Sequence, residues 1–370
     1  MLFNSLHFLI FFPVVTTLFF VLPHRLRWAM LLAASCYFYM VFKPLYILIL
    51  AFTIIVDYTA GILIEDAKGR RRKAYLVASI CANVGVLAFF KYYNFLNGSL
   101  REALGALHLA APVPPLLHIL LPIGLSFHTF QSLSYTIEVY RGRHPAERHA
   151  GIFALYVMFY PQLVAGPIER PQNLLHQFHE RHYFDYPRVV AGLQLMLWGM
   201  FKKVVIADRL SPFVNLVYDD PHSYRGVSFI VATIFFAFQI YCDFSGYSDI
   251  ALGAAQVMGF TLMKNFDRPY FSKSISEFWK RWHISLSTWF RDYVYLSLGG
   301  NRVSRPRWYF NLFFTFLVSG LWHGANWTYV IWGALNGVYL IAEIVWRQAV
   351  GEERLKKLEG GWRRLPVRVL

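Results

Sequence analysis

The sequence predicts an all-α membrane protein with about ten or eleven hydrophobic segments. Of its 370 residues, 56% are hydrophobic and 15% are charged, whereas a soluble domain carries about 25% charged residues. Apolar runs long enough to cross a bilayer recur from one end of the chain to the other. Because backbone inside lipid must satisfy its own hydrogen bonds, these runs are predicted to be helices. Their length disfavours a large soluble helical protein with an apolar core.

The hydrophobic segments follow one another along one polytopic domain. They lie near residues 7–22, 28–42, 44–64, 74–96, 116–138, 150–165, 189–207, 226–243, 246–260, 307–322 and 326–346. Several are shorter than the roughly 20 residues of a straight crossing, so we expect some to be tilted, re-entrant or paired half-helices. The expected organisation is a membrane domain over residues 1–346 and a basic amphipathic tail over 347–370, on the cytoplasmic membrane face.

The formal net charge of +15 is carried mainly by loops between the apolar segments. The clearest cluster is KGRRRK, Lys68 to Lys73, and basic loops of this kind mark the cytoplasmic side of a membrane protein. Basic and charge-poor loops alternate up to residue 150, which predicts an N-terminus outside the cytoplasm. This distribution indicates membrane lipid as a partner and argues against nucleic acid. The three cysteines lie in apolar segments without metal-ligand spacing, so no metal site is expected.

The stretch EFWKRWHISLSTWFRDYVYLSLGGNR, residues 277–302, mixes aromatic and charged side chains. On a helix, one face would carry Trp279, His283, Leu286 and Phe290. Five charges between Glu277 and Asp292 are too many for a span that faces lipid. We expect an interfacial or re-entrant helix, whose role is either catalytic or only that of a membrane-surface helix.

A second polar stretch is FQIYCDFSGYSDIALG, residues 238–253. Asp243 and Asp249 lie within or between expected spans, where an unpaired carboxylate costs about 3 kcal/mol. We expect architectural rather than catalytic roles for them, with Arg281, Arg291 or a histidine as the partner. The Ser-Gly pair between the two carboxylates is expected to let the helix break.

The apolar stretch SGLWHGANWTYVIWG, residues 319–333, contains one ionisable side chain, His323. An intramembrane ionisable residue is a candidate functional residue, and a hydrogen-bonded structural histidine is the alternative. Motifs of serine hydrolases, nucleotide-binding loops and zinc proteases are absent. A buried neutral imidazole can accept the proton of a hydroxyl as that hydroxyl attacks an acyl group. The same residue also suits a proton-coupled transporter or flippase.

Long motifs occur in one order over nearly the whole chain. They are LPIGLSFHTFQSLSYTIEVYRG (121–142), FYPQLVAGPIERP (159–171), GMFKKVVIADRL (199–210), QIYCDFSGYSDIALG (239–253), NFDRPYFSKSISEFWKRWH (265–283), FWKRWHISLSTWFRDYVYLSLGGNR and SGLWHGANWTYVIWGALNG. In these motifs the chain resembles the membrane-bound O-acyltransferase (MBOAT) family, and within it the bacterial subgroup that O-acetylates alginate. Relatives that attach D-alanine to teichoic acids share the two histidines that correspond to His283 and His323 but differ in the residues around them.

The resemblance implies a helical membrane fold around an intramembrane tunnel. The family's invariant histidine falls on His323, as the general base or as the residue that orients the nucleophile. Its second polar position falls on His283, which would polarise the acyl carbonyl or hold the donor. The supporting candidates are Asn326, Asp292, Arg291 and Trp322. Acetyl-CoA is the expected acyl donor; no tightly bound cofactor is expected, and no segment shows a nucleotide site.

The resemblance also implies a function and a location. An acetyl group would pass from a cytoplasmic donor across the inner membrane toward an exported polysaccharide, with periplasmic acetyltransferase proteins as partners. D-alanyl transfer to teichoic acid is the alternative within the family. The expected location is the bacterial inner membrane, crossed several times, with the N-terminus in the periplasm. The subgroup usually continues with further membrane helices, whereas this chain stops about two dozen residues after Trp346.

Overall fold

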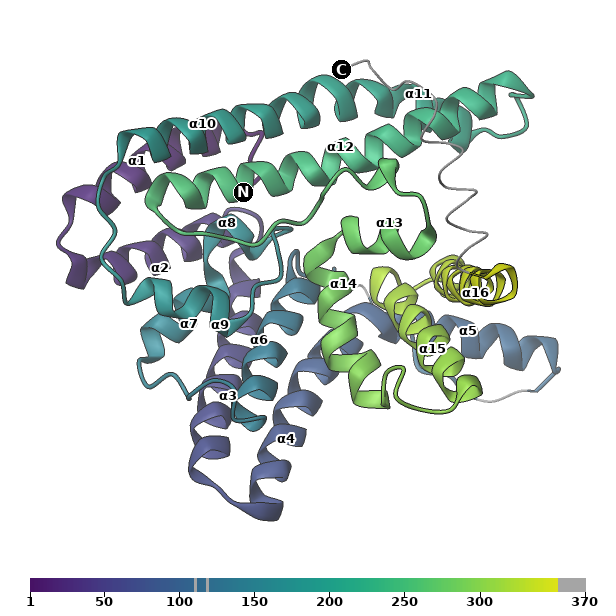
Figure 1. Cartoon of the computed structure of the whole chain (residues 1–370), viewed down its shortest axis with the longest axis horizontal. Helices are drawn as coiled ribbons and strands as arrows, with labels where there is room; N and C mark the ends of the chain where they lie inside the picture. Colours follow the sequence, from purple (N-terminus) through teal and green to yellow (C-terminus); the bar gives the residue numbers. More distant parts are fainter. Residues whose placement is uncertain (110–111, 118–119, 352–370) are drawn as a thin grey trace. The chain divides into compact units, whose positions relative to one another are not determined.

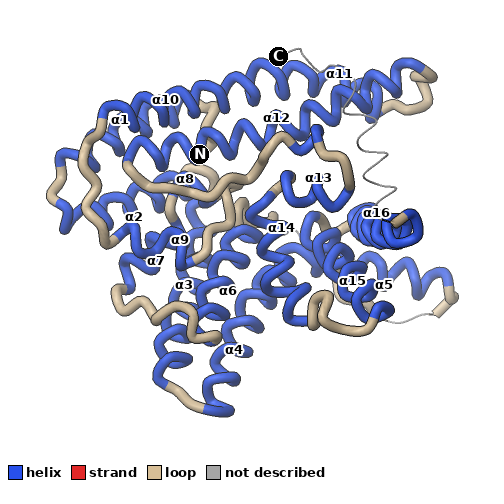
Figure 2. The backbone as a smooth tube through the Cα atoms, in the orientation of Figure 1, coloured by secondary structure: helices blue, strands red, loops and turns tan. Residues whose placement is uncertain are grey.

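The computed structural model describes residues 1–109, 112–117 and 120–351. In these residues all regular structure is helical, without a β-strand (Figure 2). Five helices are long and apolar enough to cross a bilayer: Pro44–Asp66, Gly69–Ala106, Tyr186–Asp219, Val227–Met258 and Trp327–Val350. The prediction of an all-α polytopic membrane protein is therefore confirmed. The chain divides into two compact units, Met1–Asn265 and Phe266–Leu370.

The N-terminal unit is built from helices (Figure 1). Many aromatic residues belong to its hydrophobic core. Its helices are α1 (Leu6–Val21), α2 (His24–Met40), α3 (Ile47–Asp66), α4 (Gly69–Leu87), α5 (Tyr93–Ala106), α6 (Leu125–Tyr140), α7 (Ala150–Met158), α8 (Tyr160–Leu163), α9 (Pro171–Leu174), α10 (Tyr186–Met200), α11 (Asp208–Asp219) and α12 (Val227–Met258). Phe38, Phe153 and Tyr160 are fully buried in its core. Each buried ring removes a large apolar area from the protein surface, and pairs of rings commonly pack edge to face.

Helices α10 and α12 of this unit pack so closely that their backbones are in contact. A π-helical segment, Phe201–Ala207, joins α10 to α11, and α12 lies beside both helices. Glycines face one another between α10 and α12. A Cβ added at Gly199 would lie 2.6 Å from the carbonyl oxygen of Gly246, and one at Gly192 would lie 2.8 Å from that of Gly253. Only residues without a side chain allow this approach.

The expected helix break near residue 245 is wrong. α12 continues without interruption over 32 residues, so the segments expected at 226–243 and 246–260 form one helix. Glycine permits a break, but it also permits close helix packing. Gly246 serves the second purpose here, because it lies against the backbone of α10.

The two carboxylates of α12 pair with lysines of the π-helical segment. Nζ of Lys202 lies 2.7 Å from Oδ2 of Asp249, and Lys203 pairs with Asp243. The expected pairing with Arg281, Arg291 or a histidine is therefore wrong. The glycine contacts bring the two helices close enough for lysine side chains to reach α12 directly, and opposite charges offset the cost of burial.

Two other expected segments have different limits. The segment expected at 150–165 is divided into α7 and α8 at Phe159, because Pro161 lacks the N–H group that would continue the helix. In the described part of the segment expected at 116–138, the helix begins at Leu125, after Gly124 with a φ of +78°. A Cβ at Gly124 would lie 2.6 Å from the carbonyl oxygen of Leu163, so this turn also needs glycine.

Loops that the charge pattern assigns to one side of the membrane contact one another in the N-terminal unit. The guanidinium of Arg148 lies 2.5 Å from Glu65 and 2.9 Å from Asp66 at the end of α3. Arg72, from the basic cluster at the start of α4, donates to the carbonyl oxygen of Val139 at 3.1 Å. The loops after α3 and after α6 therefore lie at the same end of these helices.

In its described residues, up to Gly351, the C-terminal unit has four α-helices and short helical turns. They are α13 (Ile275–Arg281), α14 (Ile284–Phe290), α15 (Arg305–His323) and α16 (Trp327–Val350). α15 and α16 pack side by side (Figure 1). The interfacial or re-entrant helix expected over 277–302 is not one continuous helix: it is two short helices, followed by π-helical and 3₁₀ turns up to Leu298. Most of the expected tail, residues 352–370, lies outside the described residues.

Candidate active site

The C-terminal unit contains a cavity of about 720 Å³, within the size range of ligand-binding cavities. Its walls come from α13, α14, α15 and α16 and from the turns after α14. The four positions predicted to share one helix face, Trp279, His283, Leu286 and Phe290, all line it. His323 lines it as well. The cavity therefore collects both candidate histidines, which lie 40 residues apart in sequence.

His323 is the last residue of α15. The close packing around Gly320 and Gly324 explains why the SGLWHG sequence has glycine at these two positions. A Cβ at Gly320 would lie 2.3 Å from the carbonyl oxygen of Tyr329, and one at Gly324 would lie 2.1 Å from the Tyr329 ring. The end of α15 is thus pressed against the first turns of α16, and this contact fixes the backbone that carries His323.

Aromatic rings surround the imidazole of His323. The ring centroid of Trp322 lies 4.9 Å away and that of Trp332 lies 5.1 Å away, both edge to face. Trp279 packs in turn against Trp332, with 5.8 Å between centroids. The side chain of His323 is nevertheless exposed, so the expectation of a buried imidazole is wrong. Its place at the end of a helix that borders an open cavity leaves it accessible to a reactant.

His283 has the opposite environment. It is only 3% exposed and lies between α13 and α14. Its φ of +43° is in the left-handed region, which is rare for residues other than glycine and is often found at functional sites. Burial, and then the nearby His323, hold the pKa of His283 well below its usual value. His283 is therefore a neutral imidazole near pH 7, with one N–H donor and one acceptor nitrogen.

Three of the supporting candidates have defined surroundings. Arg291 lines the cavity, and its Nε donates to Oδ1 of Asp292 at 2.7 Å. Trp322 is buried, and its ring lies near both histidines, with its centroid 6.3 Å from that of His283.

Asn326, the fourth supporting candidate, caps α16. Its Oδ1 accepts hydrogen bonds from the backbone N–H of Thr328 at 2.9 Å and from its hydroxyl at 3.0 Å. Asn326 thereby fixes the start of the helix against which His323 is packed. A direct role of Asn326 or Asp292 in orienting an imidazole stays a prediction.

Comparison with known proteins identifies the family. Residues 147–359 match the family model of the membrane-bound O-acyltransferases. The chain belongs to the MBOAT family. It is 44% identical over 347 residues to a probable alginate O-acetylase of Pseudomonas aeruginosa and 43% identical over 347 residues to one of Azotobacter vinelandii. It is 34% identical over 337 residues to a peptidoglycan O-acetyltransferase of Helicobacter pylori.

These alignments cover most of the chain but only part of each relative. They include 93%, 93% and 84% of the chain, and 66%, 68% and 63% of the Pseudomonas, Azotobacter and Helicobacter proteins, respectively. The chain thus spans about two thirds of the length of these MBOAT relatives. The matched part includes both helices that border His323.

The MBOAT cavity also contains polar residues that the sequence analysis missed. Thr315 and Ser319 line it, and both precede His323 on α15 at spacings of four residues. Asn311 continues the same stripe, and its amide donates to the carbonyl oxygens of Leu298 at 3.1 Å and Gly300 at 3.0 Å. The four-residue spacing of Asn, Thr, Ser and His in an apolar helix is the signal that would have revealed this stripe.

A second missed residue is Glu343 on α16. Its carboxylate accepts hydrogen bonds from the backbone of α13 and from Arg347. The signal was a single carboxylate within an otherwise apolar span, which requires a partner.

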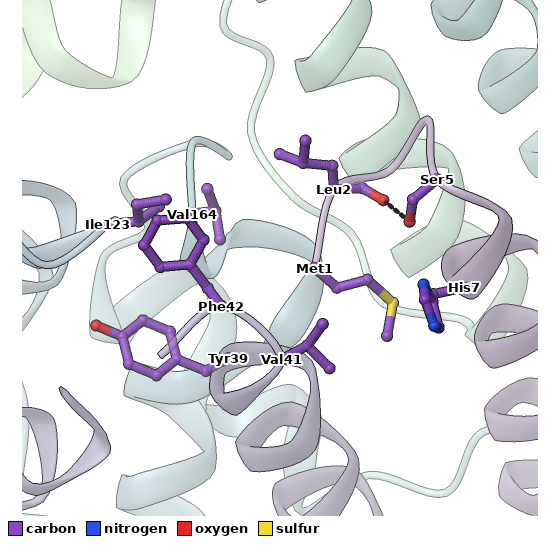
Figure 3. A pocket seen from close by; sticks show the side chains of 9 residues that line it. All are labelled: Met1, Leu2, Ser5, His7, Tyr39, Val41, Phe42, Ile123 and Val164. Atoms are coloured by element: carbon purple, nitrogen blue, oxygen red, sulfur yellow. Dashed lines mark hydrogen bonds between the residues drawn. The ribbon is translucent and has the colours of Figure 1, made fainter. Parts of the chain in front are cut away.

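A smaller pocket of about 190 Å³ lies in the N-terminal unit (Figure 3). It is lined by Met1, Leu2, Ser5, His7, Tyr39, Val41, Phe42, Ile123 and Val164. The side chains drawn are mainly apolar, and His7 is the only imidazole among them. This pocket has one histidine, whereas the cavity of the C-terminal unit has two. It also has no row of polar side chains along one helix like the one that leads to His323. We therefore assign the candidate active site to the cavity of the C-terminal unit.

Proposed function

We propose that this MBOAT protein is an O-acyltransferase that moves an acetyl group from a cytoplasmic donor to a hydroxyl acceptor on the route to an exported polysaccharide. The observation that carries the proposal is the pair of histidines in one cavity, one exposed and one buried. Acyl transfer needs a group that accepts the hydroxyl proton and a separate group that stabilises negative charge on the carbonyl oxygen. Two imidazoles in different environments can supply these functions.

His323 is the proposed general base. Its exposed imidazole accepts the proton of the acceptor hydroxyl while the hydroxyl oxygen forms a bond to the acyl carbon. The bond from the acyl carbon to the thiol sulfur of the donor then breaks, and the sulfur takes the electron pair. The proton held by His323 passes to this sulfur. The products are an O-acetyl ester and a free thiol, and His323 returns to its neutral form.

His283 is the proposed electrophilic group. Because it is neutral, its N–H can donate a hydrogen bond to the carbonyl oxygen without losing a proton to solvent. The developing negative charge on that oxygen strengthens such a bond in the transition state. Its buried position excludes water from the donor's acyl group, which limits hydrolysis.

Acetyl-CoA is the proposed donor, used as a substrate and not as a resident cofactor. Thr315 and Ser319 offer hydroxyls along one wall of a cavity whose other walls are largely apolar. A long thioester arm with amide groups matches this combination of apolar wall and spaced hydrogen-bonding groups. Support for an acetyl group rather than D-alanine comes from the relatives, since those compared above are named for O-acetylation.

The proposed location is the bacterial inner membrane, with a periplasmic N-terminus. The alternation of basic and charge-poor loops supports this orientation. Further support comes from the contacts of Arg148 and Arg72, since the loops that the charge pattern assigns to the cytoplasm lie together. The proposed partners are membrane lipid, periplasmic acetyltransferase proteins and the polysaccharide acceptor.

The test is acetyl transfer by the full chain in liposomes. The protein is supplied with acetyl-CoA labelled in the acetyl group and with acetylatable polysaccharide, together with its periplasmic partner proteins. Acetyl ester formation that depends on His323 supports the proposal. Transfer of D-alanine from a carrier-bound donor, with no use of acetyl-CoA, would replace it with the alternative within the family. Movement of unmodified substrate without consumption of a donor would identify a transporter.

A further inference from the structure

We propose that Glu343 is a positioning residue for the acyl transfer reaction. In this role it ties α13 to α16 and thereby fixes His283 relative to His323. The inference rests on the proposed function, because it concerns the geometry of the two histidines. Glu343 itself lies outside the residues that line the cavity and acts through α13.

The carboxylate of Glu343 links two helices. Its Oε2 accepts a hydrogen bond from the backbone N–H of Ser276 at 2.9 Å, in the first turn of α13. Its Oε1 accepts one from Nε of Arg347 at 2.7 Å, one turn further along α16. The side chain of Glu343 is only 11% exposed, whereas that of Arg347 is 38% exposed. Hydrogen bonds to an ionised carboxylate are about twice as strong as neutral ones.

The first turn of α13 is capped only in part from within its own segment. Oγ of Ser274 accepts from the backbone N–H of Glu277 at 3.0 Å, and the Glu277 carboxylate accepts from the N–H of Lys273 at 2.8 Å. This pair resembles a capping box, although the Glu277 carboxylate accepts from the residue before the N-cap, and it does not satisfy the N–H of Ser276 in the first turn. The contact from Glu343 satisfies that N–H, and it comes from a residue 67 positions away. Its effect is to hold α13 against α16.

The helix that Glu343 holds ends near His283 and packs against the aromatic ring that borders His323. Trp279, one turn after Ser276, packs against Trp332 at 5.8 Å between centroids and against Phe316 at 5.3 Å. Trp332 is the ring that borders His323. α13 ends at Arg281, two residues before His283. A shift of α13 along α16 would therefore move His283 and loosen the aromatic wall beside His323.

The position of Glu343 on α16 supports this interpretation. Leu340 and Ile344, which flank it on the same helix, both line the cavity. A carboxylate within an apolar span is costly unless it is paired. In this arrangement both oxygens of the Glu343 carboxylate accept hydrogen bonds. The contact between Glu343 and Ser276 lies directly behind the cavity wall.

The experiment compares Glu343→Leu, Glu343→Gln and Glu343→Asp in the full chain, assayed for acetyl transfer in liposomes. Gln348→Ala is the matched control, because Gln348 is an exposed residue of the same helix. A displacement of about 1 Å between reacting groups costs roughly 10²-fold in rate. We expect Glu343→Leu to lose kcat by about that factor, with the KM for acetyl-CoA unchanged, since the cavity walls remain. Glu343→Gln should recover most of the rate, because its amide oxygen still accepts from Ser276.

The outcomes separate the two proposals. If the wild type and Glu343→Leu both transfer acetyl groups at the same rate, the positioning role is refuted and the proposed function stands. If the folded wild type transfers no acetyl group, the proposed function fails and the positioning role fails with it. Should Glu343→Leu not fold, Glu343→Asp gives the answer. Its carboxylate is one methylene too short to reach Ser276, so full activity of this variant would also refute the positioning role.

Discussion

Replacement of Gly320 by alanine should inactivate the protein without removing any catalytic group. The added Cβ would lie 2.3 Å from the carbonyl oxygen of Tyr329 and 2.9 Å from the Cα of Gly333. Ordinary contact begins near 3.4 Å, so α15 and α16 must separate by about 1 Å. Both obstacles are backbone atoms, which cannot rotate away. His323 lies three residues further along α15 and would move with it.

A displacement of this size costs roughly 10²-fold when it separates reacting groups. The assay is acetyl transfer by membranes that contain equal amounts of wild-type and Gly320→Ala protein. Gly85→Ala is the control, because a Cβ at Gly85 meets nothing within 4 Å. We expect the control to keep its activity, since alanine is also the better helix former. Near-normal activity of Gly320→Ala would show that the position of His323 does not depend on this helix contact.

Three further predictions concern the histidines and the topology. His323→Ala should reach the membrane at near-normal levels and lose about 10²–10⁴-fold in acetylation rate; retained acetylation would make His323 a structural residue. Burial lowers the pKa of His283 in the folded protein. Below about pH 6.5, His283 therefore takes up a proton in the unfolded state but not in the folded state. The stability of the wild type should therefore fall on acidification by up to about 1.4 kcal/mol per pH unit, measured by thermal unfolding, and His283→Gln should show a weaker fall. Reporter fusions near residues 70 and 105 should give opposite signals, and equal signals would contradict the proposed orientation.

The sequence predicts the helical fold because hydropathy and backbone hydrogen bonding act locally. It does not predict which glycines break a helix and which allow one helix to approach another. Gly246 has the same neighbours in sequence whether α12 bends or packs, and only the position of Gly199 on another helix decides the outcome. The lysine partners of Asp243 and Asp249 were missed for the same reason. Contacts between helices far apart in sequence follow from packing, which hydropathy does not encode.

For the site, helical spacing correctly placed Trp279 and His283 on one cavity wall, although they do not belong to one helix. The junction between the two helices is short: only Trp282, in an extended conformation, and His283, in the left-handed region, separate them. The environments of the two histidines could not be predicted, since burial depends on how α13 and α14 pack with α15. These environments matter for mechanism. A buried neutral imidazole is poorly suited to hold a transferred proton, because its charged form is disfavoured. The exposed His323 can hold that proton, so the difference in burial supports the proposal of His323 as the base and His283 as the hydrogen-bond donor.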